Sequence, residues 1–355
     1  MEMMADLTIE ELGRRIGEFP RVKLGELPTP LQELPRLSKA LGGPRIFMKR
    51  DDLTGLAFGG NKTRMFEFLL ADALKAGADT IVGGAGVQSN YCRQLAAACS
   101  VLGLEAHLVL RELVAGEGRE IQGNLLLDLL AGATVHLITA TADQQRKAMY
   151  DLAEDLRRKG RKPYVVRMAN NEDLSFDIIS YVNCFCEIVQ QCGEVKIRPT
   201  HLYLCSYDST QSGFELGKMA LGSDVKIVGA TPETRPERAA DLIAKYCSQT
   251  ARRLGIPCSL RSEEIQSSGE YIGEGYGIPS PQGIEAIKTV ARTEGIFLDP
   301  IYSSKAMAGL FDHIRRGLLG KKDLVVFLHT GGTPALFAYR DYLVTDELKR
   351  QIVIR

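Results

Sequence analysis

Residues 79–111, DTIVGGAGVQSNYCRQLAAACSVLGLEAHLVLR, contain the pattern that decides the fold. The first eight residues form an apolar run that ends in glycines, as a buried strand does before a turn. Residues 88–103 have helical spacing and end at a glycine, and residues 105–111 form a second apolar run. A strand, a helix and a strand in this order predict a βαβ unit with parallel strands and a right-handed crossover.

The same alternation continues along the chain and divides into two series. Further elements of the first series are expected at residues 123–133, 134–139, 141–160, 162–169 and 174–191. Those of the second series are expected at residues 199–207, 213–222, 224–232, 235–255, 280–295, 303–320 and 323–332. Strands that alternate with helices are typical of parallel sheets that are buried on both faces.

We therefore predict an α/β protein with two domains, each built on a mainly parallel, twisted sheet. A chain of 355 residues is too long for one ordinary core. The smaller domain is expected to comprise residues 61–189, and the larger domain residues 1–60 and 190–355. A ligand would bind in the cleft between the domains, near the carboxyl ends of the strands.

Composition excludes several classes of function. Lys+Arg and Asp+Glu both number 44, so the net charge is zero, and we expect neither nucleic acid nor an anionic membrane as a partner. No apolar run approaches the roughly 20 residues of a membrane span. The acidic, amphipathic N-terminus resembles neither a signal peptide nor a transit peptide. We expect it to form a helix capped by Thr8, with Glu10 and Glu11 in the first turn.

The eight cysteines indicate a reducing compartment. They lie at positions 92, 99, 184, 186, 192, 205, 247 and 258, mostly in apolar segments, and none forms a C-x-x-C pair. Buried, reduced thiols in a cytoplasmic protein are therefore expected. Cys184, Cys186 and Cys192 have no nearby histidine, so we predict no metal site.

Lys62 occupies an unusual place for a lysine. It follows Gly59, Gly60 and Asn61 and begins an apolar helical pattern, where the helix dipole disfavours a positive charge. Glycines let the backbone approach a ligand closely, and a lysine in such a place loses its proton more easily. Lys62 is therefore a candidate for a Schiff-base lysine.

Three other glycine-rich or hydroxyl-rich loops follow predicted strands. Residues 83–93 resemble a G-x-G-x-x-G loop, but Ser89 stands at the third glycine position, which disfavours a nicotinamide oxidoreductase. Residues 205–213, CSYDSTQSG, have the arrangement that holds a phosphate at a helix N-terminus. Residues 328–339 form a fourth such loop. Together the four loops favour a small anionic ligand.

These loops resemble, in order and spacing, a family of pyridoxal-phosphate (PLP) enzymes. The matching segments are KRDDLTGLAFGGNKTR, QSN, STQSG, GYGIPSPQGIEAI, LDPIYSSKAMAGL and HTGGTPALFAY. The family contains D-cysteine desulfhydrase and 1-aminocyclopropane-1-carboxylate (ACC) deaminase and has PLP fold type II, the tryptophan synthase β-like fold. The resemblance implies two three-layer domains with the active site between them, a PLP-binding larger domain, and a homodimer.

The resemblance also implies roles for the loop residues. Lys62 would form the Schiff base with PLP, and Asn90 would hydrogen-bond the 3-oxygen of the cofactor. Ser89 would contact the substrate carboxylate or assist proton transfer. Ser209 and Thr210 would hold the phosphate with nearby backbone N–H groups.

Five further residues would surround the substrate and the ring. Tyr276 and Tyr302 would face the substrate, and Tyr91 stands where relatives have a histidine or glutamine. Ser303 would face the pyridine nitrogen, and Thr330 also lies at the cofactor. Relatives that open the cyclopropane ring have a glutamate and a leucine at these last two positions, so the resemblance favours β-elimination.

We therefore expect a lyase that acts on a small amino acid and converts D-cysteine to pyruvate, ammonia and sulfide. ACC deamination and elimination of a sulfonate from L-cysteate are alternatives within the class. Two unit charges about 4 Å apart interact with roughly 4 kcal/mol at an intermediate dielectric, so Asp208 in the phosphate loop would oppose the cofactor if it pointed at the phosphate. Either Asp208 points away, it pairs with a cation, or the site has changed. A binding protein that has lost catalysis is therefore a further alternative. Residues 167–176 and Tyr91 also depart from the family pattern, and both lie near the expected substrate.

Overall fold

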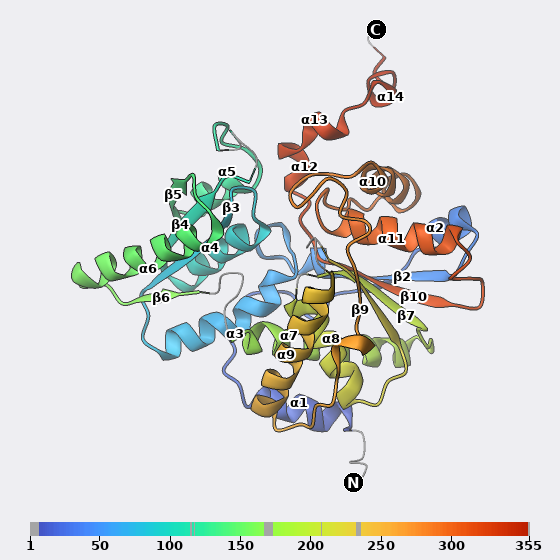
Figure 1. The fold of residues 1–355 in the computed structure, drawn as a ribbon, viewed down its shortest axis with the longest axis horizontal. Coiled ribbons are helices and arrows are strands. Elements are labelled where there is room, and N and C mark those ends of the chain that lie inside the picture. The colour runs from blue at the N-terminus through green and yellow to red at the C-terminus, as the bar shows by residue number, and fades with distance from the viewer. Residues whose placement is uncertain are drawn as a thin grey trace.

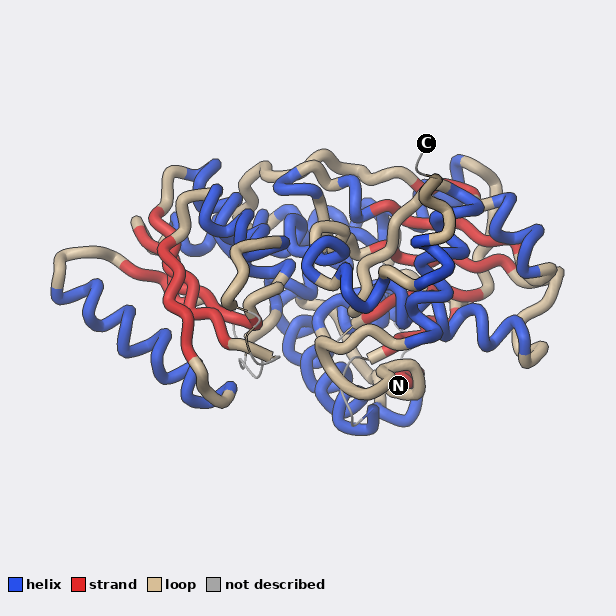
Figure 2. Tube along the Cα trace, turned by 90° about the horizontal axis from the view of Figure 1, so that it is seen from above, coloured by secondary structure: helices blue, strands red, loops and turns tan. Residues whose placement is uncertain are grey.

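The computed structural model describes residues 7–113, 116, 118–166, 173–206, 208–231 and 236–353. Two separate sheets organise these residues (Figure 1). Seen from above, the strands of the two sheets lie at opposite ends of the molecule, with helices between them (Figure 2). Within the described residues, no helix is long and apolar enough to cross a membrane. Residues 167–172 and Tyr207, which the sequence analysis singled out, lie outside the described part.

The smaller sheet has four parallel strands in the order β5-β4-β3-β6. The strands are β3 (Thr80–Gly86), β4 (Glu105–Arg111), β5 (Thr134–Ile138) and β6 (Pro163–Val165). Three helices follow them in the chain: α4 (Asn90–Leu102), α5 (Gly123–Leu130) and α6 (Ala142–Arg158). Apolar side chains of α3 (Lys62–Lys75) and α4 pack on one face of this sheet, and those of α6 pack on the other. The expected βαβ pattern of parallel strands is confirmed.

The larger sheet has six strands in the order β1-β2-β10-β7-β8-β9. They are β1 (Leu31–Glu33), β2 (Arg45–Arg50), β7 (His201–Cys205), β8 (Lys226–Ala230), β9 (Gln266–Ser268) and β10 (Leu324–His329). All neighbours are parallel except β1, which pairs with β2 in the antiparallel direction. The sequence analysis predicted β7, β8 and β10 but missed β1, β2 and β9.

Helices cover both faces of the larger sheet. One face packs on α2 (Pro35–Leu41), α10 (Pro281–Glu294) and α11 (Ser303–Arg315). The other packs on α7 (Ser175–Glu194) and α8 (Ser209–Ala220), with α9 (Pro236–Leu254) outside them. The N-terminal helix α1 (Ile9–Gly17) begins at Thr8 with a capping box that includes Glu11, which confirms the predicted cap. Short helices α12 (Ala335–Ala338), α13 (Arg340–Leu343) and α14 (Asp346–Lys349) end the chain.

Helix α7 lies across one of the predicted domain boundaries. It extends from residue 175 to residue 194 and packs against both α3 and α8, so no break in the chain marks residue 189. The division into residues 61–189 and the remaining chain therefore stays a proposal.

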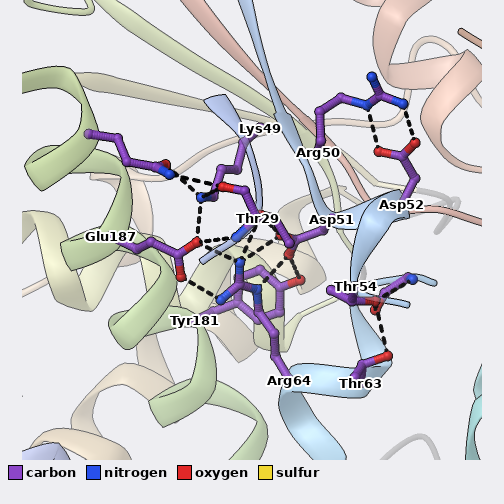
Figure 3. A network of polar contacts seen from close by, with 12 residues as sticks. Thr29, Lys49, Arg50, Asp51, Asp52, Thr54, Thr63, Arg64, Tyr181 and Glu187 are labelled. Carbon is purple, nitrogen blue, oxygen red and sulfur yellow. Dashed lines mark hydrogen bonds and ion pairs between the residues drawn. The ribbon is translucent and has the colours of Figure 1, made fainter. Parts of the chain in front are cut away.

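A buried polar network fixes the first turn of α3 (Figure 3). The Arg64 guanidinium donates to the carboxylate of Asp51 at 2.8 and 2.9 Å and to Glu187 on α7 at 2.8 Å. The Tyr181 hydroxyl donates to Asp51 at 2.7 Å. Because Arg64 is two residues after Lys62, these bonds hold the start of α3 against β2 and α7.

Candidate active site

Lys62 begins α3 directly after a turn that requires two glycines. Gly59 and Gly60 have φ angles of 69° and 134°. A Cβ at Gly59 would lie 1.9 Å from the carbonyl oxygen of Asp52, and one at Gly60 would lie 2.5 Å from Nε2 of Gln94. These contacts explain why two glycines precede the lysine: the chain passes too close to its neighbours for any side chain.

The lysine lines a cavity of about 180 Å³ between the two sheets. Its walls are Asn61, Lys62, Gly84, Ala85, Ser89, Asn90, Tyr91, Cys205, Ser206, Asp208, Ser209, Thr210, Tyr276, Tyr302 and Thr330. All the residues that the sequence analysis proposed for the site are in this set except Ser303. The four loops at strand ends therefore do meet at one place.

Ser89 and Asn90 enter the cavity at the start of α4. The Ser89 hydroxyl accepts hydrogen bonds from the backbone N–H groups of Tyr91 and Cys92, at 3.1 and 3.3 Å. Ser89 is thus the helix cap and also part of the cavity wall, where its own O–H proton is left to donate. Asn90 lies one residue further and accepts a hydrogen bond from Arg93 at 2.7 Å.

A helix N-terminus forms the opposite wall. Ser209 and Thr210 begin α8, and the Ser206 hydroxyl accepts from the backbone N–H of Gln211 at 3.0 Å. Free N–H groups and the dipole make such a terminus attractive to an anion. In this chain the carboxylate of Asp208 already accepts from the N–H of Ser209, and Asp208 is 9% exposed. Asp208 therefore does not point away from the anion site.

Two tyrosines form another wall of the cavity. The hydroxyls of Tyr276 and Tyr302 lie 2.6 Å apart, so one of them donates a hydrogen bond to the other. Both residues also border a smaller adjoining cavity that reaches Asp299. The pair brings a proton donor and an acceptor to the same side of the site.

Ser303 is fully buried behind this wall. Its hydroxyl donates to the Asp299 carboxylate at 2.6 Å and accepts from the Asp299 backbone N–H at 2.9 Å. The Asp299 carboxylate accepts from the backbone N–H groups of Tyr302 and Ser303 at the start of α11, and the Ser303 hydroxyl holds Asp299 in place. The predicted contact between Ser303 and the pyridine nitrogen stays a prediction.

The turn after β10 packs against the loop that carries Lys62. A Cβ at Gly331 would lie 2.6 Å from Cα of Gly60, and the backbone N–H of Asn61 donates to the carbonyl of Thr330 at 3.0 Å. This contact between the first and last of the four loops fixes the lysine relative to the larger sheet.

A lysine at a helix start, facing an anion-binding helix terminus between two parallel sheets, defines a class of enzymes. These enzymes hold a phosphorylated aldehyde cofactor by its phosphate and by a lysine amine. The chain belongs to the pyridoxal-phosphate dependent enzyme family, whose sequence model matches residues 22–331. PLP is the cofactor of this family.

Two named proteins are similar to this chain in sequence over nearly its whole length, and a third is similar in fold. The chain is 37% identical to the D-cysteine desulfhydrase of Salmonella typhi over 330 residues, which cover 92% of this chain and 98% of the relative. The structure superposes on an ACC deaminase homologue with a TM-score of 0.85 and 34% identity, covering 94% of this chain and 98% of that one. A diaminopropionate ammonia lyase of Escherichia coli has a TM-score of 0.65 and 16% identity, covering 96% of this chain and 92% of that one, and shows the fold alone. The predicted fold class and family are confirmed.

The residues present fit the cofactor. Lys62 supplies an amine, Asn90 and the α8 terminus supply polar groups around one cavity, and the glycine turns leave room for a flat ring. Among the described wall residues, Asp208 is the group that opposes a phosphate, because its charge has the same sign.

The sequence analysis missed several residues that the fold brings to the site. Asn61 and Ser206 line the cavity, Asp299 borders the adjoining one, and Arg93 and Asn124 contact Asn90. Arg93 could have been found, because a residue three positions after Asn90 lies on the same helix face. Asn124 belongs to no motif, and only the fold brings it near.

Proposed function

We propose that this chain is a PLP-dependent lyase that converts D-cysteine and water to pyruvate, ammonia and hydrogen sulfide. The proposal rests on one observation above all: Lys62 shares a cavity with Asn90, with the α8 terminus and with the Tyr276–Tyr302 pair. The identity to relatives named D-cysteine desulfhydrase over 92% of the chain supports the choice of substrate.

The cofactor, when bound, supplies a conjugated ring that delocalises negative charge from the α-carbon of an amino acid. Lys62 would attach to it through Nζ. The same Nζ would serve as the base that accepts the α-proton of the substrate.

The other walls orient the substrate and supply protons. The Ser89 hydroxyl, with both backbone donors on its oxygen, is left to donate its own proton to the substrate carboxylate. The hydrogen-bonded hydroxyls of Tyr276 and Tyr302 can give a proton to the departing sulfur. Ser209 and Thr210 would hold the phosphate, Thr330 would contact the cofactor, and Tyr91 would line the substrate side.

Two other substrates remain candidates. ACC deamination is supported by the likeness to an ACC deaminase homologue, but Ser303 and Thr330 stand where the ring-opening relatives have glutamate and leucine. Elimination of a sulfonate from L-cysteate would need the same framework. A binding protein that has lost catalysis is supported only by Asp208 in the anion site.

A spectrum and one assay test the proposal. Purified protein with added PLP should show a visible band, and D-cysteine should yield pyruvate faster than L-cysteate does. ACC would yield 2-oxobutyrate instead. Lys62→Ala should lose both the visible band and at least about 10³-fold in turnover, whereas Lys75→Ala, at the exposed end of the same helix, should keep both. Full activity in Lys62→Ala would refute the role of the lysine.

We also propose that the protein is a cytoplasmic homodimer. All eight cysteines are free thiols and seven are buried, which suits a reducing compartment. An apolar groove formed by α10 and the C-terminal helices suits contact with a second subunit.

A further inference from the structure

The Asn90 side chain is held in one orientation by two buried neighbours. Its Oδ1 accepts from Nη1 of Arg93 at 2.7 Å and from Nδ2 of Asn124 at 2.9 Å. A guanidinium group has donors and no acceptor, so the Asn90 atom that faces Arg93 must be the oxygen. The orientation of this carboxamide therefore follows from chemistry alone.

The same reasoning fixes Asn124. Its Oδ1 accepts from Nη1 of Arg93 at 2.8 Å, so its Nδ2 is directed to the carbonyl oxygen of Gln88 and to Oδ1 of Asn90. Arg93 and Asn124 are both fully buried, so water does not compete for these bonds. In this network the side-chain oxygens of both Asn90 and Asn124 already accept hydrogen bonds.

The Asn90 nitrogen lies beside the turn after β10. A Cβ at Gly332, in the turn after β10, would lie 2.7 Å from Nδ2 of Asn90. Asn90 lines both the main cavity and the smaller one beside it. Because its oxygen already accepts from Arg93 and Asn124, Asn90 offers a ligand only N–H donors.

Arg93 also reaches the loop that precedes Lys62. Its Nη2 donates to the carbonyl oxygen of Gly59 at 2.8 Å. One guanidinium thus ties the start of α4 to the glycine turn of Lys62. Asp128 on α5 lies near this guanidinium, and burial raises the pKa of Asp128 to about 8 even though Arg93 acts in the opposite direction. Among the described residues, both carboxyl oxygens of Asp128 are buried without a hydrogen-bond partner, as is Nε of Arg93.

We propose that Arg93 and Asn124 are positioning residues that lock Asn90 as a hydrogen-bond donor to the 3-oxygen of bound PLP. This inference rests on the proposed cofactor and on the contact between Asn90 and that oxygen. A donor at this point favours the ionised oxygen over the protonated one. Arg93 also fixes the position of Asn90 relative to the turn before Lys62, so that the Lys62 amine and the Asn90 N–H group would reach the same PLP ring.

The decisive variant is Asn124→Asp, which is nearly isosteric but cannot donate. Its carboxylate would face Oδ1 of Asn90 in place of an N–H group. We expect the visible band of bound PLP to move toward the band of an Asn90→Ala reference, and PLP to bind about tenfold more weakly. Arg93→Lys keeps one cationic donor and should give a smaller change in the same direction. Asn183→Asp on α7 and Arg158→Lys at the end of α6 are the matched controls and should match the wild type.

Absorbance across a pH series and PLP titration followed by fluorescence provide the readouts, with far-UV circular dichroism as the check on folding. A purely structural role would lower stability but leave the band of the PLP-bound fraction in place. If Asn124→Asp does not fold, Asn124→Ala removes the donor without adding charge and decides the question. A wild-type band and wild-type affinity in the folded variant would overturn this inference alone. The absence of any band in the wild type would overturn the proposed function and this inference with it.

Discussion

A carboxylate occupies the helix terminus that should receive the cofactor phosphate. Asp208 accepts from the N–H of Ser209 at the start of α8, within the cavity wall. A cofactor phosphate would approach the same N–H groups, so the two anions compete for one positive helix end. Asp208 caps the helix, and we expect it to weaken cofactor binding as well.

Asp208→Asn separates these two effects, because asparagine caps a helix about as well as aspartate but has no charge. We expect PLP to bind at least about tenfold more tightly, a fraction of the roughly 4 kcal/mol that two close charges exert at intermediate dielectric. The melting temperature of the cofactor-free protein should change little. PLP titration and thermal unfolding measure the two quantities. Asp224→Asn, at the surface, is the control, and unchanged or weaker binding by Asp208→Asn would show that the carboxylate does not compete.

The sequence predicts the site residues that lie at the ends of strands. Lys62, Asn90 and Thr210 each follow a glycine or hydroxyl motif, and parallel strands bring such loops to one edge. Arg93 and Asn124 were not predicted, because a buried polar residue shows its role only through its partner. Ser303 was predicted for the ring, yet its hydroxyl bonds to Asp299, four residues earlier, whose capping role no motif signals.

At the scale of elements, the buried network around Arg64 joins β2, α3 and α7 (Figure 3). Burial alone would raise the pKa of Asp51, but the Arg64 guanidinium, with Lys49 and the Tyr181 hydroxyl, holds that pKa below its ordinary value. The carboxylate is thus charged and fully buried, with its partners supplied by three elements. Removing one charge leaves the other without compensation.

Asp51→Asn should therefore lower the free energy of unfolding by about 3–5 kcal/mol, because Arg64 would stay buried without its main counter-charge. Denaturant titration measures the loss. The control is Asp151→Asn, which breaks the exposed Lys147–Asp151 pair on α6 and should cost under about 1 kcal/mol. Similar losses of unfolding free energy in the two variants would show that the buried pair contributes no more to stability than the exposed pair.

Glu215, on α8, is a buried acid like Asp51, but its negative charge is poorly compensated. Burial raises the pKa of Glu215 to about 7, although Lys218 and a hydrogen bond from Gln211 act in the opposite direction. The unfolded chain loses this proton near its ordinary pKa of 4.5, whereas the folded chain keeps it until about 7. The folded protein therefore binds more protons in this window, and stability falls as the pH rises through it.

Glu215→Gln should abolish that fall. Relative to the wild type, the variant should gain stability between pH 4.5 and pH 7, by up to roughly 3 kcal/mol for a shift of this size. Denaturant titrations at pH 5 and pH 8 provide the comparison. An equal difference between variant and wild type at both pH values would show that Glu215 does not titrate in the folded state within this window.

The elements that the sequence predicts well are long and regular. Helices α4, α6 and α10 and strands β3, β4 and β10 have clear apolar periods and glycine ends. Strand β2 was missed because Lys49 interrupts its apolar run. That lysine can be buried because Glu187 and Gln191, far along the chain, and the carbonyl of Thr29 all bond to its amine. Strands β1 and β9 have three residues each, too few for any period.

At the scale of the whole molecule, the two sheets face one cavity, while the C-terminal helices lead away from the body (Figure 1). An apolar groove lies beside them, lined in part by Ile284, Phe297, Leu343 and Val344. Phe337 and Phe297 are 73% and 55% exposed. Exposed aromatic side chains beside an apolar groove suit a subunit interface.

Phe337→Glu tests the proposed homodimer at this surface. The wild type should have a mass of about 78 kDa by light scattering, twice the 39.0 kDa of the chain. A buried charge in place of an aromatic anchor should weaken the dimer by roughly 30-fold or more, so the variant should approach the mass of one chain at low micromolar concentration. Val101→Glu, at an apolar position on α4 that is 62% exposed, is the matched control and should remain dimeric. A wild type of one-chain mass would contradict the homodimer, and a dimeric Phe337→Glu variant would place the interface on another face.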